Sequence, residues 1–327
     1  MSVTITFKNN KSVDEYAKMI EKEVAYMNLR DFEFFHALGE LLSFTQVAHQ
    51  FGVSQPTISH AMKRLEAYYD CDLIKKDPSH RFVVLTNEGE ILKTYVRHIL
   101  YEFTVLQRAI EHARQDQVYV GFPPMIRARL LPRLLTGEGA VELISSFDLV
   151  SGGSKALLLK LLSGQLEFSL IGSVTPLVHP NLKVKRLYQR DFYIFVSKDN
   201  PLSHKKEISF EEALDYPFVL LENDFVHTKA FQNLSDKYRK KARILFRFSD
   251  AHTIGQMVKS NVGITLMTDF IPFQDMKGLV KIPLVSEDKV SFYVQYAYLR
   301  NAVLSDKLLL FIDMLDKLSQ KDKSESS

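Results

Sequence analysis

The stretch from Ser43 to Glu66 combines hydroxyl, amide and basic side chains in a pattern that suits contact with DNA. Gly52 permits the positive φ that a chain needs to leave a helix in a tight turn. Ser54 can cap the next helix, and Pro56 lies in its first turn, where a missing N–H costs nothing. The pattern predicts two helices joined by a tight turn, the helix-turn-helix arrangement, held together by Val47, Phe51, Val53, Ile58, Met62 and Leu65.

The second of these helices leaves polar and basic residues on its outer face. Gln55, Thr57 and Ser59 are assigned to base readout, because amides and hydroxyls match the donor and acceptor pattern of base edges. Basic residues are expected to neutralise phosphates. Thr45 is expected to cap the first helix. The complete predicted DNA-binding set is Thr45, Ser54, Gln55, Pro56, Thr57, Ser59, His60, Lys63, Arg64, Lys76, His80 and Arg81.

The same turn also fits an αα-hairpin without a DNA function, which needs a small residue, a glycine and a cap as well. Acidic residues between Glu66 and Asp77 weaken the local positive charge. Turn-forming residues around Pro78 follow Ile74 and precede a β-branched stretch from Arg81, which predicts a two-stranded hairpin, or wing. The wing and its basic residues favour DNA binding.

A long helix is predicted from Asn87 to about Ala113, with Thr86 as its cap. Its apolar residues have three-four spacing, and this seam either pairs with a second copy or packs on its own domain. Before it, Ser12 to Glu15 read as a capping box for a helix to about Tyr26. The first 26 residues are either an appended arm or the result of a start codon placed too early. The seam consists of Leu92, Tyr95, Ile99, Phe103, Leu106 and Ile110.

From Val118 onward, short apolar strands alternate with amphipathic helices. This alternation is typical of βαβ units and predicts an α/β fold with a predominantly parallel sheet. The domain boundary is expected near Gln115 to Gln117. The predicted elements are strand Val118–Gly121, helix Met125–Leu135, strand Val141–Leu149, helix Lys155–Leu162 and strand Phe168–Gly172.

Composition excludes several classes of protein. The chain of 327 residues is 46% hydrophobic, with 13 Gly and 11 Pro, which excludes collagenous and low-complexity chains. A net charge of +3 is too small to identify a nucleic-acid binder by itself. The single cysteine, Cys71, excludes an intrachain disulfide and fits a cytoplasmic protein. Neither a signal peptide nor a membrane span is expected, because the longest apolar run, Ala156–Leu162, is interrupted by Lys160.

Motifs for catalysis are missing from the sequence, which contains no HExxH, no GxSxG and no P-loop. Gly137 to Gly139 lack the third glycine of a dinucleotide fingerprint, and the ten histidines show no metal-ligand spacing. We therefore expect no enzyme activity, no cofactor and no metal.

From Met27 to Gly89 the chain resembles the N-terminal domain of LysR-type transcriptional regulators. The resemblance implies a winged helix-turn-helix on double-stranded, pseudo-palindromic promoter DNA, and a linker helix that pairs two copies into dimers or tetramers. His60, Ile74 and Lys76 depart from the usual Arg, Phe and Arg. The matching positions are Met27–Arg30, Phe34–Phe35, Ser43–Thr45, Ala48, Val53–Pro56, Ile58–Ser59, Arg64–Glu66, Leu73–Ile74 and Leu85–Gly89.

The second half resembles the effector domain of the same family, which is similar to periplasmic binding proteins and has two lobes around a ligand cleft. The matching stretches include Gly121–Pro132, Leu161–Gly164, His179–Leu182 and Val262–Ile264. The implied domains are an extension of unknown role (1–26), a winged helix-turn-helix (27–86), a linker and dimerisation helix (87–116), an effector-binding domain (117–318) and a disordered tail (319–327).

Ligands of open α/β sheets bind beyond the carboxyl ends of the strands, where helix N-termini favour anions. Ser154 and Thr175 fit equally well as simple helix caps. A second group of residues could pair with a carboxylate, although isolated basic residues are usually solvated or interfacial: Arg127, Arg129, His227 and His252. The predicted effector-binding residues are Pro124, Met125, Ser154, Ser173, Val174, Thr175, Asn223 and Asp250.

Asp70–Ile74 and Ser79–Arg81 resemble the malolactic regulators within this family, whose inducer is malate. The resemblance implies a small organic acid, malate or another carboxylate, as effector. The alternative is a two-lobed α/β ligand-binding protein or an enzyme without DNA-binding function. Deletion of residues 27–90 distinguishes the two, because only a regulator would lose DNA binding and keep effector binding.

Overall fold

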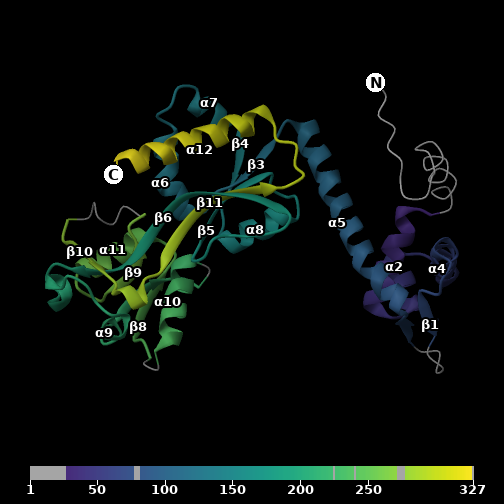
Figure 1. Cartoon of the computed structure of the whole chain (residues 1–327), viewed down its shortest axis with the longest axis horizontal. Helices are drawn as coiled ribbons and strands as arrows, with labels where there is room; N and C mark the ends of the chain where they lie inside the picture. Colours follow the sequence, from purple (N-terminus) through teal and green to yellow (C-terminus); the bar gives the residue numbers. More distant parts are fainter. Residues whose placement is uncertain (1–26, 77–81, 224, 239–240, 271–276, 326–327) are drawn as a thin grey trace, which may run out of the picture. The chain divides into compact units, whose positions relative to one another are not determined.

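In the first of two units, Met1–Leu106, the described residues form three short helices, a two-stranded sheet and the start of a long helix (Figure 1). The computed structural model describes residues 27–76, 82–223, 225–238, 241–270 and 277–325, so the helix predicted before Tyr26 lies outside the described residues. The elements are α2 (Leu29–Leu41), α3 (Phe44–Phe51), α4 (Gln55–Tyr69), and the antiparallel strands β1 (Ile74–Lys76) and β2 (Val83–Leu85), which form the predicted wing.

An ion pair joins α2 to α4. The Asp31 carboxylate accepts hydrogen bonds from Nε of Arg64 at 3.1 Å and from a second guanidinium nitrogen. Asp31 also closes a capping box with Asn28 at the start of α2. Its side chain is 0% exposed, whereas that of Arg64 is 41% exposed, so the guanidinium compensates a buried charge. Arg64, predicted to contact phosphate, therefore holds two helices together.

The long helix α5 (Asn87–Gln115) begins against the wing, as predicted. The hydroxyl of Thr86 accepts from the N–H of Gly89 at 2.9 Å and donates to the carbonyl of Asp72 at 2.7 Å. A Cβ on Gly89 would lie 2.1 Å from the carbonyl oxygen of Leu73. Only glycine permits this close approach of helix and wing.

The apolar seam of α5 differs from the prediction at one position. Leu92 is buried with Val96 in the core of the first unit, so it does not belong to the outer stripe. The outer stripe of α5, which the described residues leave exposed, consists of Ile91, Tyr95, Ile99, Phe103, Leu106 and Ile110.

The second unit, Gln107–Ser327, holds the remaining elements. Its helices are α6 (Pro124–Leu134), α7 (Ala140–Ser145), α8 (Ser154–Leu162), α9 (Phe210–Ala213), α10 (Val226–Lys237), α11 (Ala251–Lys259) and α12 (Asp306–Glu325), with 3-10 turns η1 (Pro201–His204) and η3 (Ser286–Asp288). Its strands are β3 (Val118–Gly121), β4 (Phe147–Val150), β5 (Phe168–Ser173), β6 (Leu182–Ser197), β7 (Phe218–Leu221), β8 (Ile244–Phe248), β9 (Thr265–Thr268), β10 (Leu279–Pro283) and β11 (Ser291–Leu299).

The main sheet has seven strands in the order β10-β6-β11-β5-β3-β4, with β9 also paired to β6. Among the described strands of this sheet, only β3 with β4 and β3 with β5 are parallel, while β7 and β8 form a separate parallel pair. The predicted predominantly parallel sheet is therefore wrong. The long strands β6 and β11 pair antiparallel with each other and with their other neighbours, which the early βαβ pattern did not reveal.

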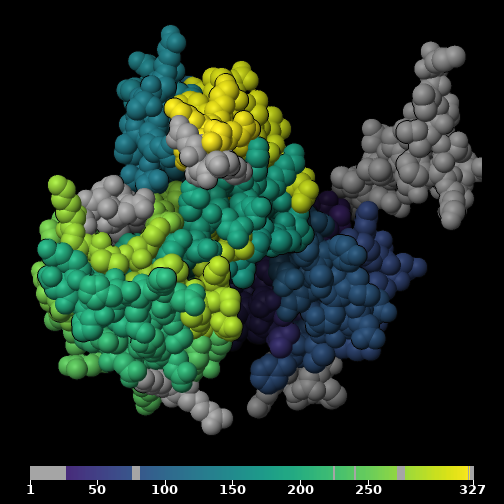
Figure 2. Space-filling model, turned by 60° about the vertical axis from the view of Figure 1, so that its left-hand side comes forward, coloured from purple at the N-terminus to yellow at the C-terminus, as the bar shows by residue number. Residues whose placement is uncertain are grey.

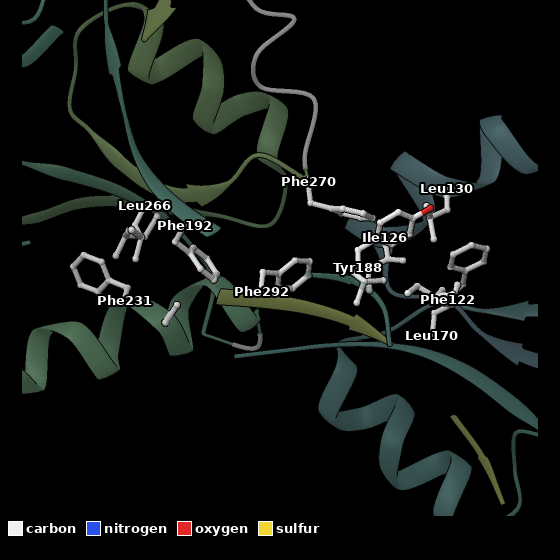
Figure 3. Close-up of a cluster of buried hydrophobic side chains, with 14 of the residues drawn as sticks. Phe122, Ile126, Leu130, Leu170, Tyr188, Phe192, Phe231, Leu266, Phe270 and Phe292 are labelled. Carbon is white, nitrogen blue, oxygen red and sulfur yellow. The ribbon is translucent and has the colours of Figure 1, made fainter. Parts of the chain in front are cut away.

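Strand β6 changes partner along its length and thereby creates two lobes. Leu182 to Asp191 pair with β11 in the first lobe, whereas Phe192 to Ser197 pair with β9 and β10 in the second. Buried side chains fill the junction, and Figure 3 shows Phe192 and Phe292 between Phe231 of the second lobe and Ile126 of the first. The predicted two-lobed architecture is confirmed.

The strand predicted over Val141–Leu149 is wrong in its first part. Residues 140–145 form the helix α7 and not the start of a strand, because the buried residues Ala140 and Ile144 are four apart, the helical spacing.

The predicted disordered tail is the end of α12, as far as residue 325. Ser319 is buried and donates to the carbonyl of Leu187 at 2.7 Å, and Asp322 pairs with Arg133. These tertiary contacts order a segment whose composition alone favours disorder. Figure 2 shows α12 (yellow) beside the blue-green segment that contains α7. In the described ranges, no helix is long and apolar enough to cross a membrane.

Replacement of Arg64 by Met should lower the free energy of unfolding by about 2–4 kcal/mol, because the buried carboxylate of Asp31 loses its cation. Urea unfolding followed by circular dichroism measures this change. Lys63→Met, on the exposed neighbour, is the control and should cost no more than about 0.5 kcal/mol. Combining Arg64→Met with Asp31→Asn should restore most of the loss. A simple sum of the two losses would contradict the proposed coupling.

Candidate functional site

The first turn of α4 presents the residues that were predicted to read bases. Ser54 is the N-cap, and its hydroxyl accepts from the N–H of Thr57 and lies 2.8 Å from the Thr57 hydroxyl. Ser59 is half-buried. The opposite face carries the buried residues Ile58, Ala61, Met62 and Leu65, which fix the helix in the core of the first unit. The exposed residues on the outer face are Gln55, Pro56, Thr57, His60 and Lys63.

The structure gives two of the predicted DNA contacts a different local setting and does not describe the side chains of three others. Ser43, and not Thr45, caps α3, so Thr45 is an exposed residue inside that helix. The prediction missed this cap because both residue types are good caps. Arg64 is paired with Asp31. The side chain of Lys76, together with His80 and Arg81, lies outside the described residues.

A cavity of about 320 Å³ opens in the second unit between its two lobes. This volume is at the small end of ligand sites, which span roughly 300–1,000 Å³. The lining is mainly apolar, with a few polar groups, as expected of a site for a small molecule. The lining residues are Pro123, Pro124, Met125, Ile126, Gly152, Gly153, Ser154, Glu222, Phe225, Val226, His227, Ser249 and Phe292.

Three helices begin at this cavity without a side-chain cap. The N-cap residues of α6, α8 and α10 are Pro123, Gly153 and Phe225, and none of them supplies a capping hydrogen bond. Amide groups in the first turn of a helix have no partner within the helix, and the helix dipole places positive potential there. The cavity therefore offers uncapped donors from both lobes, since α6 and α8 belong to the first lobe and α10 to the second.

Ser154 contributes a hydroxyl to the cavity wall. It is the first residue of α8, and its Oγ accepts from the N–H of Gly172 on β5 at 2.9 Å. A hydroxyl that accepts one hydrogen bond keeps its own proton for donation. Ser154 can therefore donate to a ligand in the cavity.

His227 is the second residue of α10 and is 3% exposed. Its ring centroid lies 5.2 Å from that of Phe192 and 5.3 Å from that of Phe292. Burial lowers the pKa of His227 to about 3, so the imidazole is neutral at physiological pH. Nε2 has no hydrogen-bond partner among the described residues, a cost of about 1–3 kcal/mol for a buried nitrogen.

The structure brings together Pro124, Met125 and Ser154 from the predicted effector site. It does not bring Ser173, Val174 and Thr175 to this cavity. The chain leaves β5 by a loop and not by a helix, and Ser173 there accepts from Nε2 of the buried Gln295 at 2.9 Å. The rule that placed these residues assumes a helix after each strand.

In the second lobe, two predicted effector-binding residues each lie one position after the residue that lines the cavity. Glu222 and Ser249 line the cavity, whereas their neighbours Asn223 and Asp250 do not. The Asp250 carboxylate instead caps α11 and accepts from the N–H of Thr253 at 2.7 Å. This hydrogen bond lowers the pKa of Asp250, so the carboxylate serves the helix.

Sequence reasoning placed His227 among isolated basic residues and omitted Phe292 and Val226. The sequence offered little indication that these residues line a site. For His227 in particular, no neighbouring residue types mark a histidine that becomes buried between two lobes. The run from Gly152 to Ser154 gave a usable signal, since two glycines before a helix allow close approach to its N-terminus.

Both halves of the chain match known families. Residues 29–90 match "Bacterial regulatory helix-turn-helix protein, lysR family", and residues 111–319 match "LysR substrate binding domain". The malolactic fermentation system transcriptional activator of Lactococcus lactis subsp. lactis is 42% identical over 292 residues, which cover 89% of this chain and 99% of that protein.

Solved structures show the same fold. An OxyR cysteine mutant from Corynebacterium glutamicum has a TM-score of 0.51 at 22% identity and covers 90% of this chain and 93% of its own. Full-length BenM has a TM-score of 0.51 at 20% identity, with coverage of 91% and 98%. With a helix-turn-helix domain and a two-lobed effector-binding domain, the chain belongs to the LysR family of bacterial transcriptional regulators.

Proposed function

We propose that this regulator acts in the cytoplasm, that its effector is a small organic acid, and that the acid binds in the cavity between the lobes. The observation that carries the proposal is the convergence of three uncapped helix N-termini on one small cavity. Free amides and positive helix ends favour an anion. Malate is the first candidate, because the relative with 42% identity is named for the malolactic fermentation system.

The acid regulates by binding one arrangement of the lobes better than the other. Its carboxylate contacts α8 of the first lobe and α10 of the second when the lobes approach each other. An effector with equal affinity for both arrangements would change nothing, so these bridging contacts supply the coupling.

The DNA-bound form in this proposal is a dimer or a tetramer. The outer stripe of α5 is apolar and exposed over several turns, which fits pairing with the same stripe of a second copy. Paired chains place two α4 helices on half-sites that are about one turn of DNA apart, or a multiple of it.

A fluorescence titration tests the proposal as a whole. The labelled DNA is the fragment upstream of the protein's own gene, and random DNA of equal length is the control. Selective binding that shifts when L-malate or citrate is added supports both parts of the proposal. Selective binding that no organic acid alters would contradict the acid effector.

Gln55→Ala should weaken binding to the specific fragment by about 1–3 kcal/mol and leave binding to random DNA unchanged, because an exposed amide reads base edges. Lys63→Ala should weaken both and reduce the salt dependence by about one phosphate contact. Titrations at several salt concentrations measure these effects. If Gln55→Ala lowers the affinity for both DNAs equally, the assignment of Gln55 to base readout is wrong.

Ile99→Asp should shift the protein toward monomers, since a carboxylate in the centre of the outer stripe would be buried against a second copy. Light scattering after size exclusion measures the mass. His98→Asp, on an exposed neighbour outside the stripe, is the matched control and should keep the parent assembly. An unchanged mass for Ile99→Asp would place the self-association elsewhere.

Gly153→Asp should weaken binding of the acid about tenfold or more, because the new carboxylate caps α8 and repels an anion. The backbone of Gly153 (φ −65°, ψ 149°) accepts a side chain without strain. Gly153→Ala is the control and should change affinity by less than about threefold. Isothermal titration calorimetry with L-malate gives both values, and tight binding to Gly153→Asp would argue against an anion at α8.

A further inference from the structure

One residue that lines the cavity, His227, carries a buried polar atom without a hydrogen-bond partner among the described residues. Among buried side-chain atoms without a hydrogen-bond partner in the described part of the chain, Nε2 of His227 is the one that belongs to a lining residue. Phe192 and Phe292 stand beside the imidazole and offer no conventional donor or acceptor. Nε2 is itself buried, so the partner that it lacks must be a group that enters the cavity and comes against the ring.

The surroundings of His227 favour an uncharged partner. Burial lowers the pKa of His227, so the imidazole is neutral at physiological pH. The neighbouring strand β11 has no acidic or basic residue, and Glu222, which is exposed, is the other acid or base among the lining residues. A neutral imidazole has one donor and one acceptor nitrogen. A hydroxyl group matches it, since it can donate or accept.

The position of His227 on its helix limits how far this hydroxyl can be from a carboxylate. His227 is the second residue of α10, so its ring projects from the same turn whose amides lack a cap. A ligand that meets both must therefore carry its carboxylate and its hydroxyl close together. Adjacent carbons provide this arrangement in 2-hydroxycarboxylic acids.

We propose that His227 selects 2-hydroxycarboxylic acids by hydrogen bonding to their hydroxyl group, while the helix N-termini bind the neighbouring carboxylate. The proposal rests on the acid effector proposed above and narrows its chemical class. It makes His227 a specificity-determining residue, because an acid without the hydroxyl leaves the imidazole unpaired.

Two pairs of acids that differ by this hydroxyl test the proposal: L-malate with succinate, and L-lactate with propionate. Calorimetry on the full chain should show that at least one hydroxy acid binds about tenfold tighter than its partner. His227→Phe keeps an aromatic ring between Phe192 and Phe292, so it should bind the simple acid within about threefold of the parent and lose the preference. His227→Asn retains a hydrogen-bonding group and should keep part of it.

The outcomes separate this proposal from the one on which it rests. Equal affinity of the parent protein for both members of a bound pair overturns the hydroxyl contact but leaves an acid effector in place. A preference that survives in His227→Phe overturns the role of His227, and His227→Leu decides the point if circular dichroism shows that the Phe variant does not fold. Binding of none of the four acids by the parent overturns both proposals.

Discussion

The change of partner along β6 determines where the site of the regulatory unit forms. One strand is paired to β11 over its first part and to β9 and β10 over its second, so a single backbone belongs to both lobes. The change occurs at Phe192, whose ring contacts those of Phe292 and His227. Side chains at this point have neighbours from both lobes, and the cavity is lined by residues of both lobes.

Side-chain caps distinguish the helices of the cavity from most others. Helices α2, α3, α4, α9 and α11 are capped by Asn28, Ser43, Ser54, Ser209 and Asp250. The three helices that begin at the cavity and lack a cap leave their amides to water or to a ligand. Helix α7 also begins without a side-chain cap, at Gly139, but does not line the cavity. The missing caps of α6, α8 and α10 are informative because these three helices begin at the same cavity.

The sequence predicted those features that depend on neighbours along the chain. The turn at Gly52, the cap at Ser54 and the start of α5 at Thr86 follow from local residue types, and the structure confirms each. Features that depend on distant partners were missed. Arg64 meets Asp31 from 33 positions away, and His227 becomes buried only where two lobes meet. The prediction of effector-binding residues in the loop after β5 failed for a related reason. It assumed a helix after β5, whereas the next element is the antiparallel strand β6.

The two segments that cross between the lobes are joined to each other. The N–H of Phe192, where β6 enters the second lobe, donates to the carbonyl of Val290, where the chain returns, at 3.0 Å. Paired extended segments bend and twist less freely than single loops, so the lobes are connected by a stiff torsional element and not by a free hinge. If the lobes close on a ligand as proposed, this closure would therefore have a small amplitude and would store elastic strain in the paired segments. Dissociation of the ligand would then let this strain return the lobes to their resting arrangement, and the regulator would reset without any source of chemical energy.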